Sequence, residues 1–111
     1  MLKSMILGMI RKRIAKLQNK DVDSVEFVRF DVDKINEKLS INSNFGGDTK
    51  PLSEFSEFAE MLENQFSKRV KIQKLFKYEL MINFKLKSVN SEIFYLDEKG
   101  NKLNLEIKDV F

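Results

Sequence analysis

The spacing of apolar residues changes in the second half of the chain, from a helical repeat over residues 52–66 to strict alternation over residues 78–86. Before the change, apolar residues recur every three or four positions: Leu52, Phe55, Ala59, Leu62 and Phe66. After it, they take every second position: Tyr78, Leu80, Ile82, Phe84 and Leu86. The first spacing indicates an amphipathic helix, and the second a strand with one solvated face. A chain of 111 residues that contains both patterns predicts a single α+β domain, residues 1–111.

We expect two main helices, at residues 1–20 and 51–67, and a mostly antiparallel sheet of about four strands. The strands are expected at 25–32, 78–87, 92–96 and 102–107, the last two forming a hairpin whose turn contains Gly100. Asp33 is a suitable cap for a short helix, because Ile35 and Leu39 follow at helical spacing. Residues 40–50 are rich in Ser, Asn and Gly and predict a long loop, with Phe45 as a plug that pins it to the core. The predicted order is α-β-(short α)-α-β-β-β, and no internal repeat is visible in the sequence.

The helix expected at residues 1–20 carries two apolar facets where a surface helix needs one. One facet is made of isoleucines and the other of methionines: Ile6, Ile10 and Ile14, and Met1, Met5 and Met9. Together they form an arc about twice as wide as the roughly 100° stripe that packs against one core. We expect the isoleucine facet to face the core and the methionine facet to remain for a partner, since methionine adapts to the shape of a partner. The predicted protein interface consists of Met1, Met5, Ile6, Met9 and Ile10.

The residue types that the chain lacks exclude several classes of site. It contains no Cys and no His, so disulfides, thiolate nucleophiles, Cys/His zinc sites and imidazole bases are impossible. Gly46 and Gly47 lie outside any phosphate-loop pattern, and the paired aspartates lack the Gly and Glu of a calcium loop. The glutamates between residues 54 and 63 occupy the side of a helix opposite its apolar stripe, which is typical of a solvated face. We therefore expect no catalytic residue, metal, cofactor or small-molecule substrate.

The net charge is only +3, but the basic residues are clustered. Residues 1–20 hold six bases and no acid, and a second group of bases lies between residues 68 and 77. The surface predicted for an anionic partner combines both groups: Arg11, Lys12, Arg13, Lys16, Lys68, Arg69, Lys71, Lys74 and Lys77. If the second helix continued past residue 67, its bases would lie in a row that neutralises phosphates. Nucleic-acid binding is therefore an alternative function, and attachment of the basic N-terminal helix to a membrane surface is a third.

These features favour a small, non-enzymatic protein–protein interaction module. The surplus apolar arc on residues 1–17 predicts that the protein self-associates or binds another protein through its N-terminal helix. The apolar run from Met5 to Ile10 is short and is followed by Arg-Lys-Arg, which does not match a secretory signal peptide. A cytoplasmic location is therefore expected. Small accessory proteins of phages and mobile elements share this profile.

Overall fold

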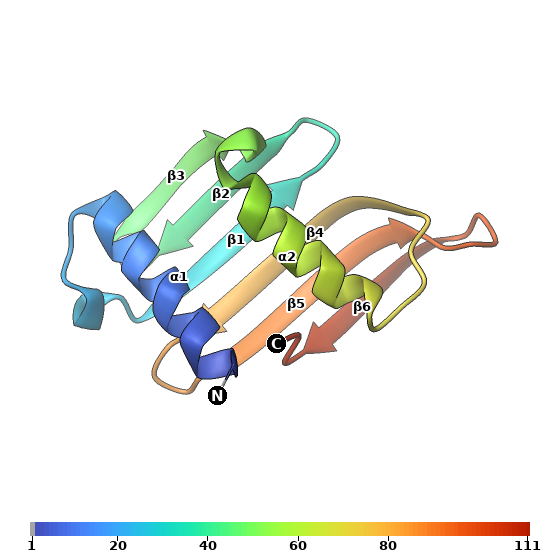
Figure 1. Ribbon diagram of the computed structural model, residues 1–111. Coiled ribbons are helices and arrows are strands. Elements are labelled where there is room, and N and C mark those ends of the chain that lie inside the picture. The colour runs from blue at the N-terminus through green and yellow to red at the C-terminus, as the bar shows by residue number, and fades with distance from the viewer. Residues whose placement is uncertain (1) are drawn as a thin grey trace.

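The computed structural model describes residues 2–111, which form a six-stranded antiparallel sheet with two α-helices on one of its faces (Figure 1). Helix α1 spans Leu2–Gln18 and helix α2 spans Ser56–Ser67. A short 3₁₀ helix, η1 (Val22–Ser24), follows α1, and another, η2 (Leu52–Phe55), precedes α2. The strands are β1 (Phe27–Asp33), β2 (Lys38–Ser43), β3 (Gly46–Pro51), β4 (Lys74–Asn83), β5 (Ser88–Leu96) and β6 (Lys102–Lys108). Their order across the sheet is β3-β2-β1-β4-β5-β6.

The two halves of the chain share one architecture. Residues 2–51 supply α1 and the antiparallel strands β1–β3, and residues 52–111 supply α2 and the antiparallel strands β4–β6. Because β1 pairs with β4 in antiparallel fashion at the centre of the sheet, an approximate two-fold axis relates the halves. The turns between β1 and β2 and between β4 and β5 correspond, since each ends on a residue with positive φ, Glu37 (54°) and Lys87 (52°). The backbone therefore repeats although the sequence does not.

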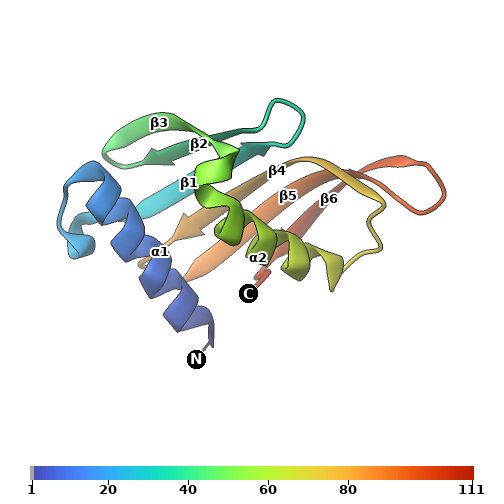
Figure 2. The same ribbon diagram turned by 45° about the horizontal axis from the view of Figure 1, so that its top comes forward.

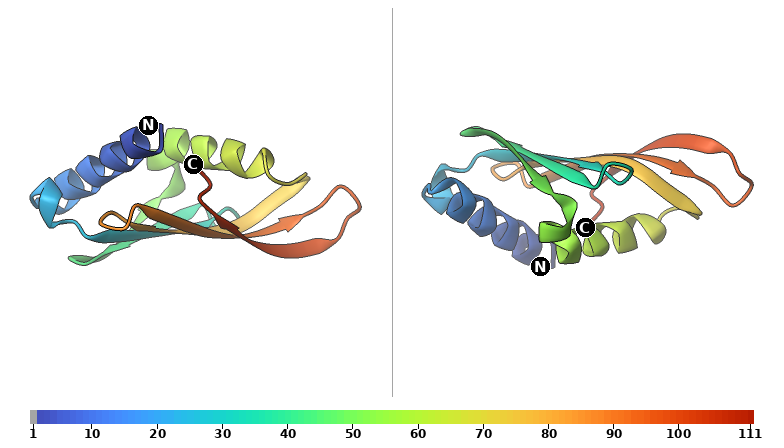
Figure 3. Two further views of the ribbon diagram at one scale, coloured as in Figure 1. Left: turned by 90° about the horizontal axis from the view of Figure 1, so that it is seen from below. Right: turned by 90° about the horizontal axis from the view of Figure 1, so that it is seen from above.

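The core lies between the helices and one face of the sheet (Figure 3). Alternate residues of β1 and β4 point into it, among them Phe30, Leu80 and the fully buried Tyr78. The helices contribute the apolar stripes of their inner sides: Leu7, Ile10 and Ile14 from α1, and Ala59, Leu62 and Phe66 from α2. Burial of these stripes explains why both segments form helices, since each has one apolar side that the sheet removes from water. Within residues 2–111, the opposite face of the sheet carries no helix (Figure 3).

The structure confirms the predicted α+β class, the two helices and the antiparallel sheet, but the predicted number and order of strands are wrong. Residues 40–50 are not a loop, because they supply most of the hairpin of β2 and β3. The alternation of the buried Leu39 and Ile41 with the more exposed Lys38, Ser40 and Asn42 is the signal of a strand. Phe45 lies in the turn of this hairpin, remains 39% exposed and has the Lys20 ammonium 5.1 Å from its ring centre, so it is not a buried plug.

Several boundaries also differ from those expected, since β4 covers Lys74–Asn83 in place of 78–87 and β5 covers Ser88–Leu96 in place of 92–96. The predicted short helix after Asp33 is a tight turn, in which the Asp33 carboxylate accepts hydrogen bonds from the backbone N–H groups of Ile35 (3.0 Å) and Asn36 (3.1 Å). The helix predicted over residues 51–67 is confirmed, although its first turn is the 3₁₀ helix η2. It ends at Ser67, and β4 already begins at Lys74, so the bases between residues 68 and 77 do not continue a helix.

Candidate binding surfaces

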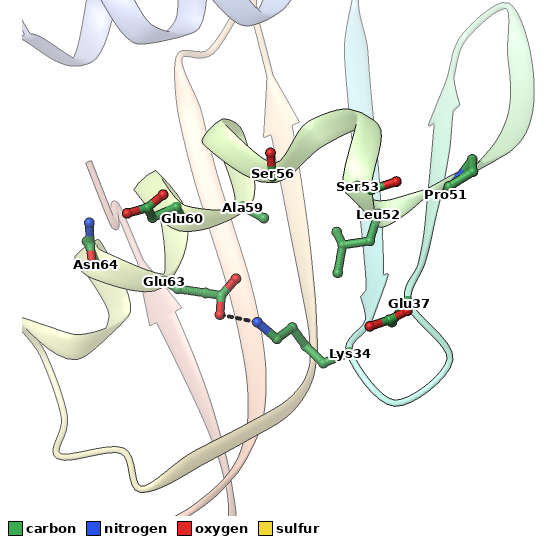
Figure 4. Close-up of a pocket in the computed structure, with 10 residues that line it drawn as sticks. All are labelled: Lys34, Glu37, Pro51, Leu52, Ser53, Ser56, Ala59, Glu60, Glu63 and Asn64. Carbon is green, nitrogen blue, oxygen red and sulfur yellow. Dashed lines mark hydrogen bonds and ion pairs between the residues drawn. The ribbon is translucent and has the colours of Figure 1, made fainter.

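A hollow of about 530 Å³ lies between α2, η2 and the turn that joins β1 to β2 (Figure 4). The side chains of Lys34 and Glu63 point toward one another across it, with Nζ 2.5 Å from Oε1. From strand β4, the Tyr78 hydroxyl donates a hydrogen bond to the other carboxylate oxygen of Glu63 (3.2 Å). Burial, together with the Glu63 charge, raises the pKa of Tyr78 far above its ordinary value, so the phenol remains protonated.

This arrangement leaves no free acid–base pair. Both oxygens of Glu63 already have donors, and Lys34 is held by the same carboxylate. Lys34, Glu63 and Tyr78, which we call the Glu63 group, link α2 to β4 and to the turn after β1. We therefore assign this group a structural role. Among residues 2–111, no cluster of three or more His, Cys, Asp or Glu side chains has the geometry of a metal site.

A second candidate is the outer side of α1. The most exposed apolar side chains of this helix are those of Leu2 (67%), Met5 (65%) and Met9 (69%). Because they are three and four residues apart, they form one line along the helix, which Lys12 and Lys16 continue toward its C-terminal end. We call the line formed by Leu2, Met5 and Met9 the α1 ridge. It points away from the sheet, since the buried residues Ile10 and Ile14 occupy the other side of α1.

Beside the α1 ridge lies a hollow of about 200 Å³ between the two helices, which we call the interhelical groove. Its walls are mostly apolar: Ile6, Met9, Ile10 and Arg13 from α1, and Glu57, Phe58 and Met61 from α2. The ring centres of Phe58 and Phe30 are 4.9 Å apart, and this contact anchors the α2 wall of the groove to the sheet. The two helices run side by side in opposite directions and make little direct contact with each other (Figures 1 and 2).

The predicted protein interface divides between core and surface. Met5 and Met9 are exposed, Ile6 is half-buried at the groove, and Ile10 belongs to the core. Met1 lies outside the described residues. The sequence analysis missed Phe58 and Met61, which complete the groove. They could have been found from the sequence, because Phe58 and Met61 immediately precede the predicted core positions Ala59 and Leu62. This spacing places a second apolar line on α2 beside its main stripe.

The residues predicted to bind an anionic partner do not form one surface. On α1, the Arg11 guanidinium donates to the carbonyls of Val25 and Asp23 (both 2.9 Å), and the Arg13 guanidinium lies 4.9 Å from the ring centre of Phe55. Only Lys12 and Lys16 of this group extend freely into solvent. The second group, Lys68, Arg69, Lys71, Lys74 and Lys77, follows α2 at the other end of the helical layer (Figure 1). The structure therefore separates the two groups.

The bases of the second group make separate contacts with different parts of the fold. Arg69 donates to the carbonyl of Asp109 (2.8 Å), and Lys71 lies 4.0 Å from the Glu98 carboxylate. The Lys74 ammonium is 5.3 Å from the ring centre of Phe76, and Lys77 lies on the open face of the sheet. These bases form no continuous row along which phosphates could bind.

The open face of the sheet carries a row of four carboxylates that the sequence did not reveal. Cross-strand pairing places one acid opposite the next on four neighbouring strands: Asp31, Glu79, Glu92 and Glu106. A hollow of about 430 Å³ lies over the last three, and Arg29 bridges the first two at 3.3 Å (Asp31) and 2.8 Å (Glu79). Burial raises the pKa of Asp31 above its usual value, the Glu79 charge raises it further, and Arg29 opposes both.

Comparison with family models, with curated proteins and with solved structures gave no match to this chain. In the part of the chain that the structure describes, no helix is both long and apolar enough to cross a membrane.

Proposed function

We propose that the protein is a small, non-enzymatic protein-binding module whose binding surface is formed by the α1 ridge and the interhelical groove. The observation that supports this function is the exposure of Met5 and Met9 directly beside a groove that the chain's own side chains leave unfilled. A flexible methionine line next to an apolar groove offers both a protrusion and a recess to another protein.

The apolar area supports the same function. With about two thirds of each residue exposed, Leu2, Met5 and Met9 together present roughly 400 Å² of mostly apolar surface, within the roughly 300–600 Å² of the largest apolar patch on a typical monomer, which is often a functional one. The half-buried groove residues Ile6, Phe58 and Met61 extend it. A specific interface buries about 800 Å² per partner, so the ridge alone supplies close to half of one side.

Other exposed apolar residues lack this continuity. Ile35 (71%) and Leu86 (76%) are as exposed as Met9, but each stands alone in a hairpin turn. Single exposed apolar residues are ordinary features of protein surfaces. They therefore serve as matched controls for the ridge.

The proposed function is tested with a photo-crosslinking amino acid at position 9 in cells that express the protein, with position 86 as the control site. We expect position 9 to give a discrete adduct, identified by mass spectrometry, whose yield falls when Met5→Glu is also present. The charge at position 5 would break the same contact while the crosslinker stays at position 9. Equal adduct yields at positions 9 and 86, or a yield at position 9 that ignores Met5→Glu, would contradict the function.

A further inference from the structure

We infer that the occupant of the interhelical groove is helix α1 of a second copy of this chain, related by a two-fold axis that runs parallel to the helices. This inference rests on the proposed function, because it names the partner of the same surface. Its first basis is that the protruding α1 ridge and the recess beside it belong to one face of one chain. A two-fold dimer requires such a self-complementary surface, since each copy must offer what the other receives.

The proposed axis, parallel to the helices, determines how the copies would meet. Rotation about an axis parallel to the helices preserves the direction of each helix and its level along that axis. Because α1 and α2 of one chain are antiparallel, the partner's α1 would also run antiparallel to α2 (Figure 1). Met9 is level with Phe58 and Met61 within one chain, since all three line the same groove. The Met9 side chain of the second copy would therefore reach the level of Phe58 and Met61.

In the same register, basic residues of α1 in one copy would face acidic residues of η2 and the start of α2 in the other. Toward the C-terminal end of α1, the ridge continues as Lys12 and Lys16, whereas the exposed Glu54 lies on η2 and the exposed Glu57 in the first turn of α2. Arg13 fixes the level of these residues within the chain, because it lines the groove opposite Glu57 and donates to the Glu54 carbonyl (3.4 Å). In the dimer, Lys12 and Lys16 of one copy would lie beside Glu57 and Glu54 of the other.

The charged residues at this contact are free for such pairing. Within residues 2–111, Lys12, Lys16, Glu54 and Glu57 form no ion pair. The axis would generate every lysine–glutamate contact twice. The same axis brings the bases of the two α1 helices to one level, and Arg13 lines the groove, so Glu54 and Glu57 are the groups that offset this repulsion. The lysine–glutamate contacts therefore favour one register and a second copy over an apolar segment of arbitrary sequence.

Sedimentation equilibrium of charge-reversal variants tests this inference. We expect the unmodified protein to dimerise and both Lys12→Glu and Glu57→Lys to weaken dimerisation by about tenfold or more, because each places like charges at both symmetric contacts. An equimolar mixture of the two variants should dimerise again, because a mixed dimer restores opposite charges at both contacts. Lys99→Glu, an exposed reversal in the turn before β6, is the control and should leave the dissociation constant unchanged.

A protein that stays monomeric up to about millimolar concentration would overturn the inference, since Kd values beyond that range are too weak for a specific dimer. So would a dimer that Lys12→Glu and Lys99→Glu affect equally, or variants that do not recombine on mixing. If the protein is monomeric but position 9 still crosslinks to a different protein, only the identity of the partner is refuted. If neither occurs, the proposed function fails as well.

Discussion

Removing one charge from the row of carboxylates on the open face should stabilise the fold. Glu92 lies on β5 directly between Glu79 on β4 and Glu106 on β6, and no base forms an ion pair with it within residues 2–111. Side chains at directly opposed positions have Cβ atoms about 4.5–5.5 Å apart, and like charges there are destabilising. The substitution Glu92→Gln keeps the shape of the side chain and removes both repulsions.

The magnitude follows from the number of opposed neighbours. At roughly 0.2–1 kcal/mol for each cross-strand charge contact, the loss of two repulsions should raise the free energy of unfolding by about 1 kcal/mol. For a domain of this size, that corresponds to an increase in melting temperature of about 4 °C. Because the face is solvated, salt should screen the repulsion and reduce the gain.

Thermal and urea denaturation at pH 7, in low salt and in about 1 M salt, measure this gain. The control is Glu98→Gln, which removes an exposed acid whose contact with Lys71 is 4.0 Å long and should change stability little. The reasoning is refuted if Glu92→Gln is no more stable than the unmodified protein in low salt. A gain of the same size in high salt would also show that charge repulsion is not its cause.

Three further substitutions test the core, the Glu63 group and the electrostatics of Asp31. Leu62→Ala should cost about 3 kcal/mol in urea denaturation, because the side chain is fully buried between α2 and the sheet, and a loss below about 1 kcal/mol would contradict that packing. Tyr78→Phe removes a hydrogen-bond donor from Glu63 and should cost about 1 kcal/mol, whereas an unchanged stability would deny the bond a structural role. The raised pKa of Asp31 means that the folded state holds this proton to a higher pH than the unfolded state, so its contribution makes stability fall as pH rises from about 4 through the folded pKa. Asp31→Asn should remove that part of the decline, and an identical pH profile for both proteins would contradict the assignment.

Local patterns identified the helices and strands where burial is periodic. The stripe from Phe55 to Phe66 and the alternation after Tyr78 predicted α2 and β4, because one side of each element is removed from water. The hairpin of β2 and β3 was missed because Gly, Ser and Asn are common in loops and β3 is an exposed edge strand with no buried residue. The pairing of a strand depends on its neighbours in space, which its own residues do not specify.

The same limit applied to the candidate surfaces. The methionines of α1 were predictable from helical spacing alone, and the structure places Met5 and Met9 in solvent. The groove was not predictable, because Phe58 and Met61 come from a helix about fifty residues away in the sequence, beyond any local periodicity. The row of carboxylates on the open face depends on the register of four strands, which only the fold determines.

Because the chain contains no cysteine, disulfide trapping between two single-cysteine variants tests the central claim, that the interhelical groove receives α1 of a second copy. The Met9→Cys variant is mixed with the Met61→Cys variant under mild oxidation, and Leu86→Cys replaces the second variant as the control. A disulfide forms readily only when the two Cα atoms approach within about 7 Å. We expect rapid formation of the disulfide-linked pair of the Met9→Cys and Met61→Cys chains, well ahead of the pair with Leu86→Cys. Equal rates for the two mixtures would contradict this claim.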